Sequence, residues 1–325
     1  MKKTIILTIF GFLIFNLSFG QDRDKYSELI IKAWDLYQTK DYKKSAEKYS
    51  EAFSKKGVNS ETSDRYNAAC SWALAKEVDS SFVQLFKIAK SGDYKNYNHI
   101  IKDSDLSLLQ IDKRWNEVLA LIKINKEKSE ENFDKPLVTT LDIIYQSDQS
   151  SRDELEKISE KYGWKSDEIK EQWKKIDKID SINLIKIKQI LDERGWMGTD
   201  KIGDQGNVTL FLVIQHSDLE TQEKYLPMLK DAVNNGRAKA SYLALLEDRV
   251  ALRNGRKQIY GSQVGQDEKT GEPYVLPLID PDNVDKRRAE VGLGNLQSYL
   301  SNYNMIWDLE EYKKQLPELE AKQKK

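Results

Sequence analysis

The apolar residues of the first third of the chain recur three and four positions apart, as they do along one face of an amphipathic helix. Two such runs are marked by Tyr26, Leu29, Ala33 and Tyr37 and then by Ala46, Tyr49 and Phe53. The polar residues 40–42 separate them, so the pattern predicts a helical hairpin. Residues 66–73 and 82–89 repeat the pattern. Two hairpins in tandem are typical of a helical repeat.

The order of small and aromatic residues in this region resembles the tetratricopeptide repeat. The resemblance lies in residues 33–37, 40–46 and 49–53. Lys40 replaces a common glycine and Ser45 a common alanine, and residues 103–115 are similar to the degenerate closing helices of such arrays. The resemblance covers about residues 24–125 and implies a short array that binds a peptide or partner protein on its concave face.

A charged and polar run over residues 126–132 contains no apolar side chain and predicts a solvated helix extension or linker. We therefore expect tetratricopeptide-like repeats over 21–125 and a linker over 126–135. A second domain then covers 136–305, and the charged residues 306–325 form a C-terminal tail.

Helical spacing over 184–191 and 243–250 predicts two helices of the second domain, which end at Gly195 and Gly255. Pro227 lies inside a third apolar segment, where we expect the helix to kink or restart.

Short apolar stretches over 258–264 and 273–278 flank a polar turn and predict a small β-hairpin. Asp280 and Pro281 then suit the N-cap and first position of another helix. The predicted fold is mainly α: a short tetratricopeptide-like array followed by a helical domain with a small β-hairpin.

The N-terminus has the pattern of a secretory signal peptide. Lys2 and Lys3 precede the apolar residues 4–19, and Gly20 suits cleavage, which predicts a leader over residues 1–20. The alternative is a membrane anchor, but the run is shorter than the ~20 residues of a spanning helix and contains Asn16. We expect an exported protein, periplasmic or secreted, with no stable membrane anchor after cleavage.

Charge and cysteine content exclude several classes of function. With 52 basic and 53 acidic residues the chain is nearly neutral, so we expect no nucleic-acid partner. The single cysteine, Cys70, cannot form an intramolecular disulfide and suits a buried core position. His99 and His216 fall in different domains, and no pair of residues has structural zinc spacing. No phosphate-binding glycine loop is present. We predict neither a metal nor a cofactor.

His216 is the central candidate for chemistry because histidine alone has an unperturbed pKa near neutral pH. If residues 208–216 are helical, Thr209, Val213 and His216 share one face, and the ring completes an apolar stripe as a core histidine. The run also allows a strand over 208–214. Proton transfer by His216 is the competing interpretation.

The polar residues after His216 have a structural explanation. Ser217 and Glu220 match a capping box, with Asp218 in the first turn of the next helix. The alternative is that Asp218 or Asp148 orients His216.

Three arginines are candidates for anion binding. Arg249 starts from a half-apolar helix face, so it either extends to the edge of the core or binds a carboxylate from Asp148 or a ligand. Arg287 and Arg288 suit an anion clamp, but nearby acidic residues at helical spacing offer local partners.

Short polar motifs of the second region, in order, resemble one bacterial family of domains of unknown function, the DUF6624 family. They are residues 148–152, 183, 195–196, 215–218, 248–249, 258–263 and 285–288. Met197 and Ser262 depart from the residues common in the family. The resemblance runs from about Pro136 to Tyr303 and implies that these polar residues belong to one domain, without implying an activity.

The favoured function is binding of a peptide or protein partner by the repeats. The alternative is an enzyme in the second domain with His216 as general acid or base, Asp218 or Asp148 orienting it, and Arg152 or Arg249 stabilising negative charge. A third interpretation is that the polar residues only brace the fold. The candidate ligand-binding residues are Gln149, Arg152, Gln215, Arg249, Tyr260, Gln263, Arg287 and Arg288.

Overall fold

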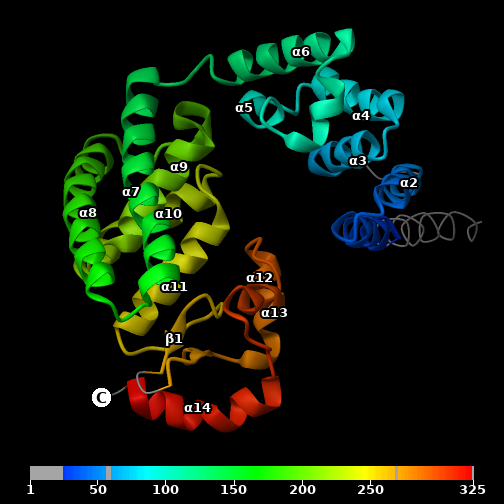
Figure 1. Ribbon diagram of the computed structural model, residues 1–325. Helices are drawn as coiled ribbons and strands as arrows, with labels where there is room; N and C mark the ends of the chain where they lie inside the picture. Colours follow the sequence, from blue (N-terminus) through cyan, green and yellow to red (C-terminus); the bar gives the residue numbers. More distant parts are fainter. Residues whose placement is uncertain (1–24, 56–59, 268–269, 324–325) are drawn as a thin grey trace, which may run out of the picture. The chain divides into compact units, whose positions relative to one another are not determined.

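The computed structural model describes residues 25–55, 60–267 and 270–323, so the predicted leader over 1–20 lies outside the described residues. The described chain is mainly helical with one small antiparallel hairpin, which confirms the predicted fold class (Figure 1). Contacts divide the chain into one unit that ends at Glu131 and another that begins at Asn132. No helix in the described ranges has both the length and the apolar character needed to cross a bilayer.

The first unit is a succession of helices joined by short turns. Residues 25–38 are helical, and α2 (Tyr42–Phe53), α3 (Thr62–Leu74), α4 (Val78–Ser91), α5 (Tyr97–Ile100), η1 (Ser104–Leu109) and α6 (Lys113–Ser129) follow. Contacts join α2 to α3, α3 to α4 and α4 to α6. Each helix therefore packs mainly on its neighbours in sequence, which is the behaviour of a helical repeat.

The two helical hairpins have the same turn. Lys40 and Lys76 both adopt the left-handed conformation, with φ of 64° and 63°. Left-handed backbone favours glycine, yet both turns have lysine at this position. The two hairpins thus share one turn conformation, as expected of a helical repeat.

A buried hydroxyl joins the two helices of each hairpin. Ser45 Oγ donates to the carbonyl of Ala33 over 2.8 Å, and Ser81 Oγ donates to that of Ala69 over 2.7 Å. Because each hydroxyl has an acceptor, serine is accommodated in the core where alanine is common.

The segment between α4 and α6 covers one face of α3. Tyr94 stacks on Tyr66 of α3 with 4.9 Å between ring centres, and η1 contacts α3. Ile100, Leu106 and Leu109 are fully buried in the same core. The closing helices predicted over 103–115 are thus a 3₁₀ turn and the start of α6, and they pack on the repeats.

The predicted linker is partly helical. α6 continues through the charged run to Ser129, and α7 begins at Lys135, so only about one turn of chain separates the two helices. The charged residues extend a solvated helix end, and the contact boundary falls between Glu131 and Asn132.

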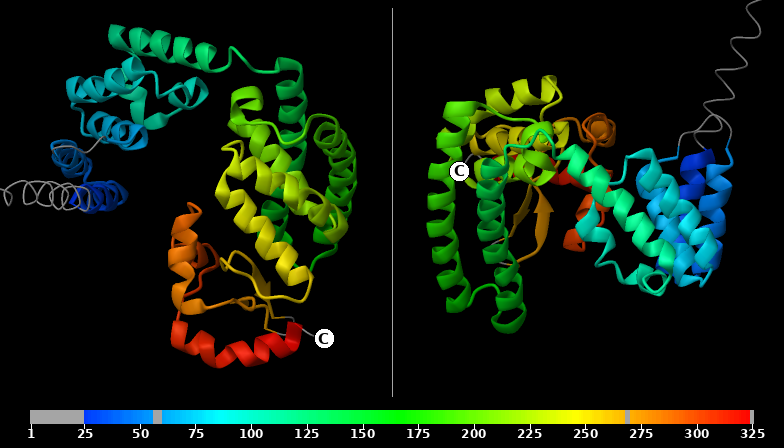
Figure 2. Two further views of the ribbon diagram at one scale, coloured as in Figure 1. Left: turned by 180° about the vertical axis from the view of Figure 1, so that it is seen from behind. Right: turned by 90° about the horizontal axis from the view of Figure 1, so that it is seen from above.

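Five long helices form the larger part of the second unit. They are α7 (Lys135–Tyr162), α8 (Asp167–Arg194), α9 (Thr199–His216), α10 (Leu219–Asn234) and α11 (Ala240–Arg253). α7, α8 and α9 contact one another, and α10 contacts α11 (Figures 1 and 2). Their core includes the fully buried Leu141, Ile187 and Ile214. The helix prediction over 208–216 is confirmed, and the strand alternative is wrong.

Glycine ends two of these helices as predicted. Gly195 follows α8 and Gly255 lies just after α11, each with φ of 69°. α10, however, continues through Pro227 as one helix, so the predicted restart is wrong. Pro227 lies on the exposed face, where water can satisfy the carbonyl that loses its partner.

The remainder of the second unit is a hairpin followed by short helices. β1 (Val264–Gln266) pairs with β2 (Pro273–Val275), with Val264 opposite Val275. The predicted hairpin forms, but its first strand begins at Val264, where the predicted strand ended, and its second strand is shorter than predicted. η2 (Pro281–Asn283), α12 (Val284–Glu290), α13 (Leu296–Leu300), η3 (Ser301–Tyr303) and α14 (Leu309–Gln323) follow.

Two local predictions change here. Asp280 occupies the N-cap position, but the turn it begins is 3₁₀ and its side chain caps no backbone N–H. Residues 309–323, expected within a charged tail, form α14, whose Tyr312 and Leu319 are buried against β2 and α13 residues. Apolar side chains seven positions apart lie on one helix face, which explains why this charged segment packs on the domain.

Candidate functional site

Three helices of the second unit bring one group of ionisable side chains together. Asp148 and Arg152 lie one turn apart on α7, Asp180 lies on α8, and His216 is the last residue of α9. Nearby, Asn183 of α8 and Ser147 of α7 hydrogen-bond over 3.1 Å, which fixes the register of the two helices beside the group.

His216 is bound to a buried carboxylate. Its Nδ1 lies 3.2 Å from Oδ1 of Asp148. Asp148 is only 1 % exposed, whereas the side chain of His216 is 21 % exposed. The imidazole therefore connects a buried charge with the surface of the unit.

The surroundings of Asp148 favour its charged form. Burial is the largest single influence and raises the pKa of the carboxyl, but His216, Arg152 and Gln149 together lower the pKa below its usual value. Gln149 Nε2 donates to Oδ2 over 2.6 Å, and Arg152 Nη1 lies 3.2 Å from Oδ1. An ionised carboxylate only accepts hydrogen bonds, so Nδ1 of His216 is the protonated nitrogen that donates.

Arg152 links the two carboxylates of the group. Its Nη1 and Nη2 donate to the two carboxylate oxygens of Asp180 over 3.1 and 2.8 Å, a bidentate pair, and Nη1 also donates to the carbonyl of Asp148 over 3.0 Å. The guanidinium is therefore occupied by protein acceptors. Arg152 positions the acids, and the expectation that it stabilises negative charge on a ligand is not supported by this geometry.

A pocket of about 230 Å³ lies beside His216. α8 contributes Asp177, Asp180 and Ser181 to its lining, and the end of α9 and the residues after it contribute His216, Ser217 and Asp218. The positions on α8 share one helix face. The volume suits a small ligand, and the lining offers mostly oxygen acceptors.

The acids of this group are also arranged like a cation site. One oxygen each of Asp148 and Asp180 and a nitrogen of His216 all lie within 4.8 Å of one another. Arg152 already bridges these two carboxylates, so a metal ion would have to displace its guanidinium. The two carboxylates therefore have the Arg152 guanidinium as their cation.

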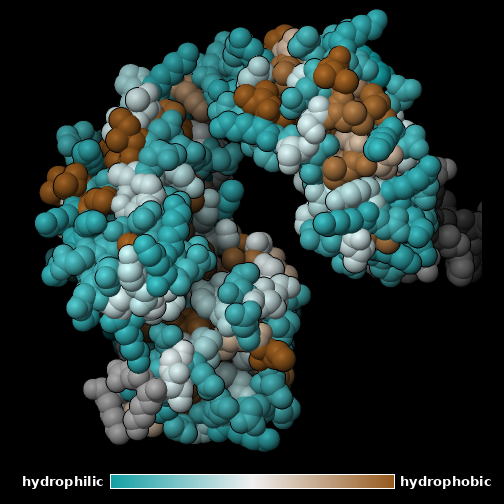
Figure 3. All heavy atoms as spheres, in the orientation of Figure 1, coloured by the Kyte–Doolittle hydropathy of each residue, from teal (hydrophilic) through white to brown (hydrophobic). Residues whose placement is uncertain are grey.

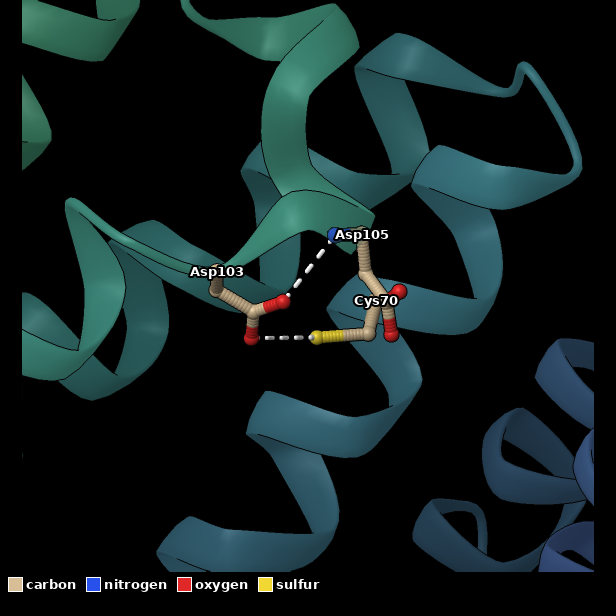
Figure 4. A group of neighbouring side chains, drawn as sticks. All are labelled: Cys70, Asp103 and Asp105. Atoms are coloured by element: carbon tan, nitrogen blue, oxygen red, sulfur yellow. Dashed lines mark hydrogen bonds between the residues drawn. The ribbon is translucent and has the colours of Figure 1, made fainter.

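A second such group lies in the first unit, where Cys70, Asp103 and Asp105 converge (Figure 4). Asp103 accepts hydrogen bonds from the Cys70 thiol at 3.7 Å, from the Tyr66 hydroxyl at 2.7 Å and from the backbone of Asp105 at 3.0 Å. Burial, followed by the charges of Asp103 and Asp105, raises the pKa of the thiol. Hydrogen bonds to neutral groups satisfy Asp103, which secures η1 to α3.

The sequence model of a family described as "Family of unknown function (DUF6624)" matches residues 124–311. The chain belongs to the DUF6624 family. Comparisons with curated proteins and with solved structures give no match. The matched DUF6624 region contains Asp148, Arg152, Asp180 and His216.

Asp218 has a different role in the DUF6624 domain from the one predicted. It is the N-cap of α10, where its carboxylate accepts from Thr221 N over 2.7 Å. That hydrogen bond, given mainly by the Thr221 backbone, lowers the pKa of the carboxyl. Ser217 instead donates to the Ile214 carbonyl over 2.7 Å. The expected Ser217–Glu220 capping box is wrong by one residue, and Asp148 is the acid that orients His216.

Asp248 and Gln258 hold the loop after α11. Both are fully buried. Asp248 accepts from the backbone N–H groups of Ile259, Tyr260 and Ser262, and Gln258 exchanges hydrogen bonds with the Gln263 backbone over 3.0 and 2.9 Å. This polar motif braces a loop.

Arg287 and Arg288 extend the same bracing network. Arg287 Nε donates to the Ile259 carbonyl over 2.9 Å, and Arg288 Nη1 donates to the Tyr260 carbonyl over 2.7 Å. Arg287 also pairs with Asp280 over 3.2 Å. The two guanidinium groups therefore bind mainly backbone carbonyls rather than the acidic residues at helical spacing that the local interpretation predicted, and this geometry does not support an anion clamp.

Arg249 binds neither Asp148 nor another acid of the described chain. Its Nη1 donates to the Gln215 carbonyl over 2.8 Å and its Nε to Oε1 of Gln263 over 3.1 Å. Of the candidate ligand-binding residues, Gln149 and Arg152 contact Asp148. Tyr260 and Gln263 make no hydrogen bond to His216 or Asp148 within the described part of the domain.

Sequence reasoning missed Asp177 and Asp180. Their signal was weak: they lie on one face of α8, three positions apart, and Asn183, one turn further on, was already part of the recognised motif set. Nothing in the local sequence shows that this face meets α7 and the end of α9.

Proposed function

We propose that the DUF6624 domain binds a small ligand in the pocket beside His216 and catalyses a proton transfer. His216 transfers the proton, and Asp148 orients the ring. The observation that carries the proposal is the 3.2 Å contact between Nδ1 of His216 and the buried, charged carboxylate of Asp148 beside a pocket of about 230 Å³.

The geometry gives each nitrogen of the ring a separate role. With its proton on Nδ1 directed at Asp148, a neutral His216 has its lone pair on Nε2. Nε2 makes no hydrogen bond to any residue within 25–55, 60–267 or 270–323. It is therefore free to accept a proton from a ligand hydroxyl or water, and the Asp148 charge stabilises the resulting imidazolium.

Imidazole nitrogen NMR on the full chain tests the assignment. We expect the Nδ1–H tautomer of His216 in the wild type and a mixture of tautomers in Asp148→Asn, because the amide no longer fixes the donor. A wild-type ring in the Nε2–H form contradicts the proposal.

The second test is activity against a panel of small chromogenic esters, amides and phosphoesters. A substrate turned over by the wild type is expected to lose a factor of roughly 10²–10⁴ in rate with His216→Ala. His99→Ala is the matched control, since His99 is the other histidine of the chain and lies in the first unit. Equal activity of both variants would count against His216.

We also infer that the first unit is a tetratricopeptide-type module that binds a peptide. The repeated hairpin turn supports this inference. Residues 94–109 cover one face of α3, so the peptide would bind to a different surface of the unit. A groove of about 400 Å³ lies on α4 and α6, with Phe82, Val83 and Phe86 along it and Lys87 and Lys90 among its basic residues. An acidic peptide with apolar side chains matches this lining.

Apolar side chains reach the surface of this unit. Val83 is half exposed, and apolar patches interrupt a mainly hydrophilic surface in Figure 3. We expect acidic peptides on an array to bind the wild type and to release when Lys87 and Lys90 are both changed to Glu. Lys32→Glu with Lys95→Glu is the control pair on exposed lysines outside the groove. Binding that survives the first pair of changes contradicts the groove assignment.

Export completes the proposal, on the evidence of the leader pattern over residues 1–20. Mass spectrometry of the protein recovered from its native cell is expected to find Gln21 as the N-terminal residue. A retained Met1 would sink the prediction of cleavage.

A further inference from the structure

Arg249 carries a positive charge that no acidic side chain neutralises. Within the described chain, no carboxylate lies in ion-pairing distance of its guanidinium, in contrast to Arg152 and Arg287. Its two hydrogen bonds go to a backbone carbonyl and to a neutral amide. A largely desolvated charge without a counter-charge is costly unless a ligand or solvent compensates it.

The surroundings make the position more electropositive. Burial is the main cause of the lowered pKa of Arg249, and the positive charges of Arg253 and Arg152 lower the pKa further. Arg253 is exposed, and its Nη1 donates to the Ser217 carbonyl over 2.7 Å. Two guanidinium groups are thus hydrogen-bonded to backbone carbonyls at the end of α9.

Helix capping explains only part of this arrangement. The carbonyls of Gln215 and Ser217 belong to the C-terminal end of α9, where the helix dipole favours cations. Each of these carbonyls accepts a hydrogen bond from the Nη1 group of one arginine. Nη2 of Arg249 makes no hydrogen bond to a residue that the structure describes, so the outer edge of its planar fork is open to a ligand.

Tyrosine hydroxyls lie in the same region. Tyr299 donates to the Ser262 carbonyl over 2.7 Å, and its hydroxyl lies 3.2 Å from that of Tyr303. Burial, and then the Tyr303 hydroxyl, raises the pKa of Tyr299, which keeps this phenol protonated and neutral. Both hydroxyl protons are thus used within the protein, so the positive charge of Arg249 and Arg253 is the feature of this region that suits an oxyanion.

We propose that Arg249 is the centre of an oxyanion-binding subsite, completed by Arg253, for the carboxylate or phosphate group of a small ligand. The residues that hold these arginines, Gln215 and Ser217, directly flank His216 in the chain. The subsite thus lies at the C-terminal end of α9, the helix that ends at His216. The subsite goes beyond the proposed function, because it names an anionic group that the domain binds independently of proton transfer by His216.

Titration of the full chain with inorganic phosphate and, separately, with acetate tests the subsite. Chemical shifts of the arginine Nε–H groups and thermal unfolding report binding. We expect at least one of the two anions to bind at millimolar concentration, and the stronger of them identifies phosphate or carboxylate as the recognised group. Failure of both to bind overturns the proposal.

Variants distinguish specific anion binding at Arg249 from nonspecific electrostatic attraction of anions to the protein. Arg249→Gln is expected to weaken anion binding by at least about tenfold, since it removes a charge-assisted donor fork. Arg249→Lys keeps the charge but loses the fork, and we expect it to recover only part of the affinity. Arg256→Gln is the control, because Arg256 is an exposed arginine just beyond the end of α11. Equal affinity of the wild type and Arg249→Gln overturns the proposal.

Two further variants keep the test decisive. If Arg249→Gln unfolds, Arg253→Gln carries the test, with an expected loss of roughly three- to fivefold in anion affinity from the lower local charge. Unchanged affinity in Arg253→Gln then overturns the subsite. His216→Ala is expected to bind anions as the wild type does. Anion binding that persists there while turnover is lost separates the subsite from the acid–base proposal.

Discussion

Asp148 and Asp248 are the same residue type, each on a helix of the second unit and each buried, at 1 % and 0 % exposed. Asp148 binds the side chains of His216, Arg152 and Gln149, and the balance lowers its pKa. Asp248 binds backbone N–H groups of one loop, and burial outweighs these bonds and raises its pKa. One buried acid thus binds side chains and the other binds backbone. Only Asp148 has a partly exposed ionisable partner, His216.

The largest expected effect is on the loop acid. Asp248→Ala leaves the N–H groups of Ile259, Tyr260 and Ser262 without their acceptor, so we expect a loss of about 3–5 kcal/mol in the free energy of unfolding. Urea denaturation measures it. A loss below about 1 kcal/mol would show that the loop does not depend on Asp248.

Asp148→Asn is expected to cost less, about 1–3 kcal/mol, because the amide retains an oxygen that accepts from Arg152 or Gln149. The same denaturation experiment applies, and the tautomer of His216 should change in this variant alone. Equal costs at Asp148 and Asp248 would remove the distinction between the two acids.

The pH dependence of stability should differ in sign. Asp148 has a lowered pKa in the folded state, so its stabilisation is present above the unfolded-state value of about 3.9 and is lost as pH falls through the folded value. Asp248 has a raised pKa, so its contribution is greatest below about pH 3.9 and decreases as pH rises through the folded value. Unfolding free energies of Asp148→Asn and Asp248→Asn, each compared with the wild type from acid to neutral pH, test this. Differences that change in the same direction would contradict it.

The smallest effect is expected at Asp218, which the sequence placed in the site. Asp218→Ala should cost about 1 kcal/mol through loss of the α10 cap and should leave the His216 tautomer unchanged. A changed tautomer would show that Asp218 also acts on His216 and would weaken the contrast between the capping acid Asp218 and the orienting acid Asp148.

The helices were largely predictable because their apolar spacing and glycine ends are local properties. α8 and α11 end near Gly195 and Gly255, where left-handed backbone is needed. Pro227 was misleading because proline removes a hydrogen bond inside a helix, but here it lies on the exposed face of α10, where water can satisfy the freed carbonyl. The charged α14 was predicted to be a tail because its few apolar residues stabilise the helix only by packing against the rest of the domain.

The site was predictable only in part. His216 was identifiable because the chain has only two histidines, and Asp148 and Arg152 were identifiable as members of the short polar motifs. The sequence could not choose between Asp148 and Asp218 as its partner, because Asp148 lies 68 positions away. Asp180, which completes the Arg152 bridge, carried no distinguishing local signal.

The sequence by itself determined the mainly helical fold, the repeated hairpins of the first unit and membership in one family, since periodicity, turn residues and short motifs act over a few positions. Only the tertiary structure decided which polar residues converge. Hydrogen bonds and ion pairs extend over about 3 Å, and packing of α7, α8 and α9 brings residues from three distant segments within that range. The same physics separates the open guanidinium of Arg249 from the occupied one of Arg152, and sequence shows both only as arginine.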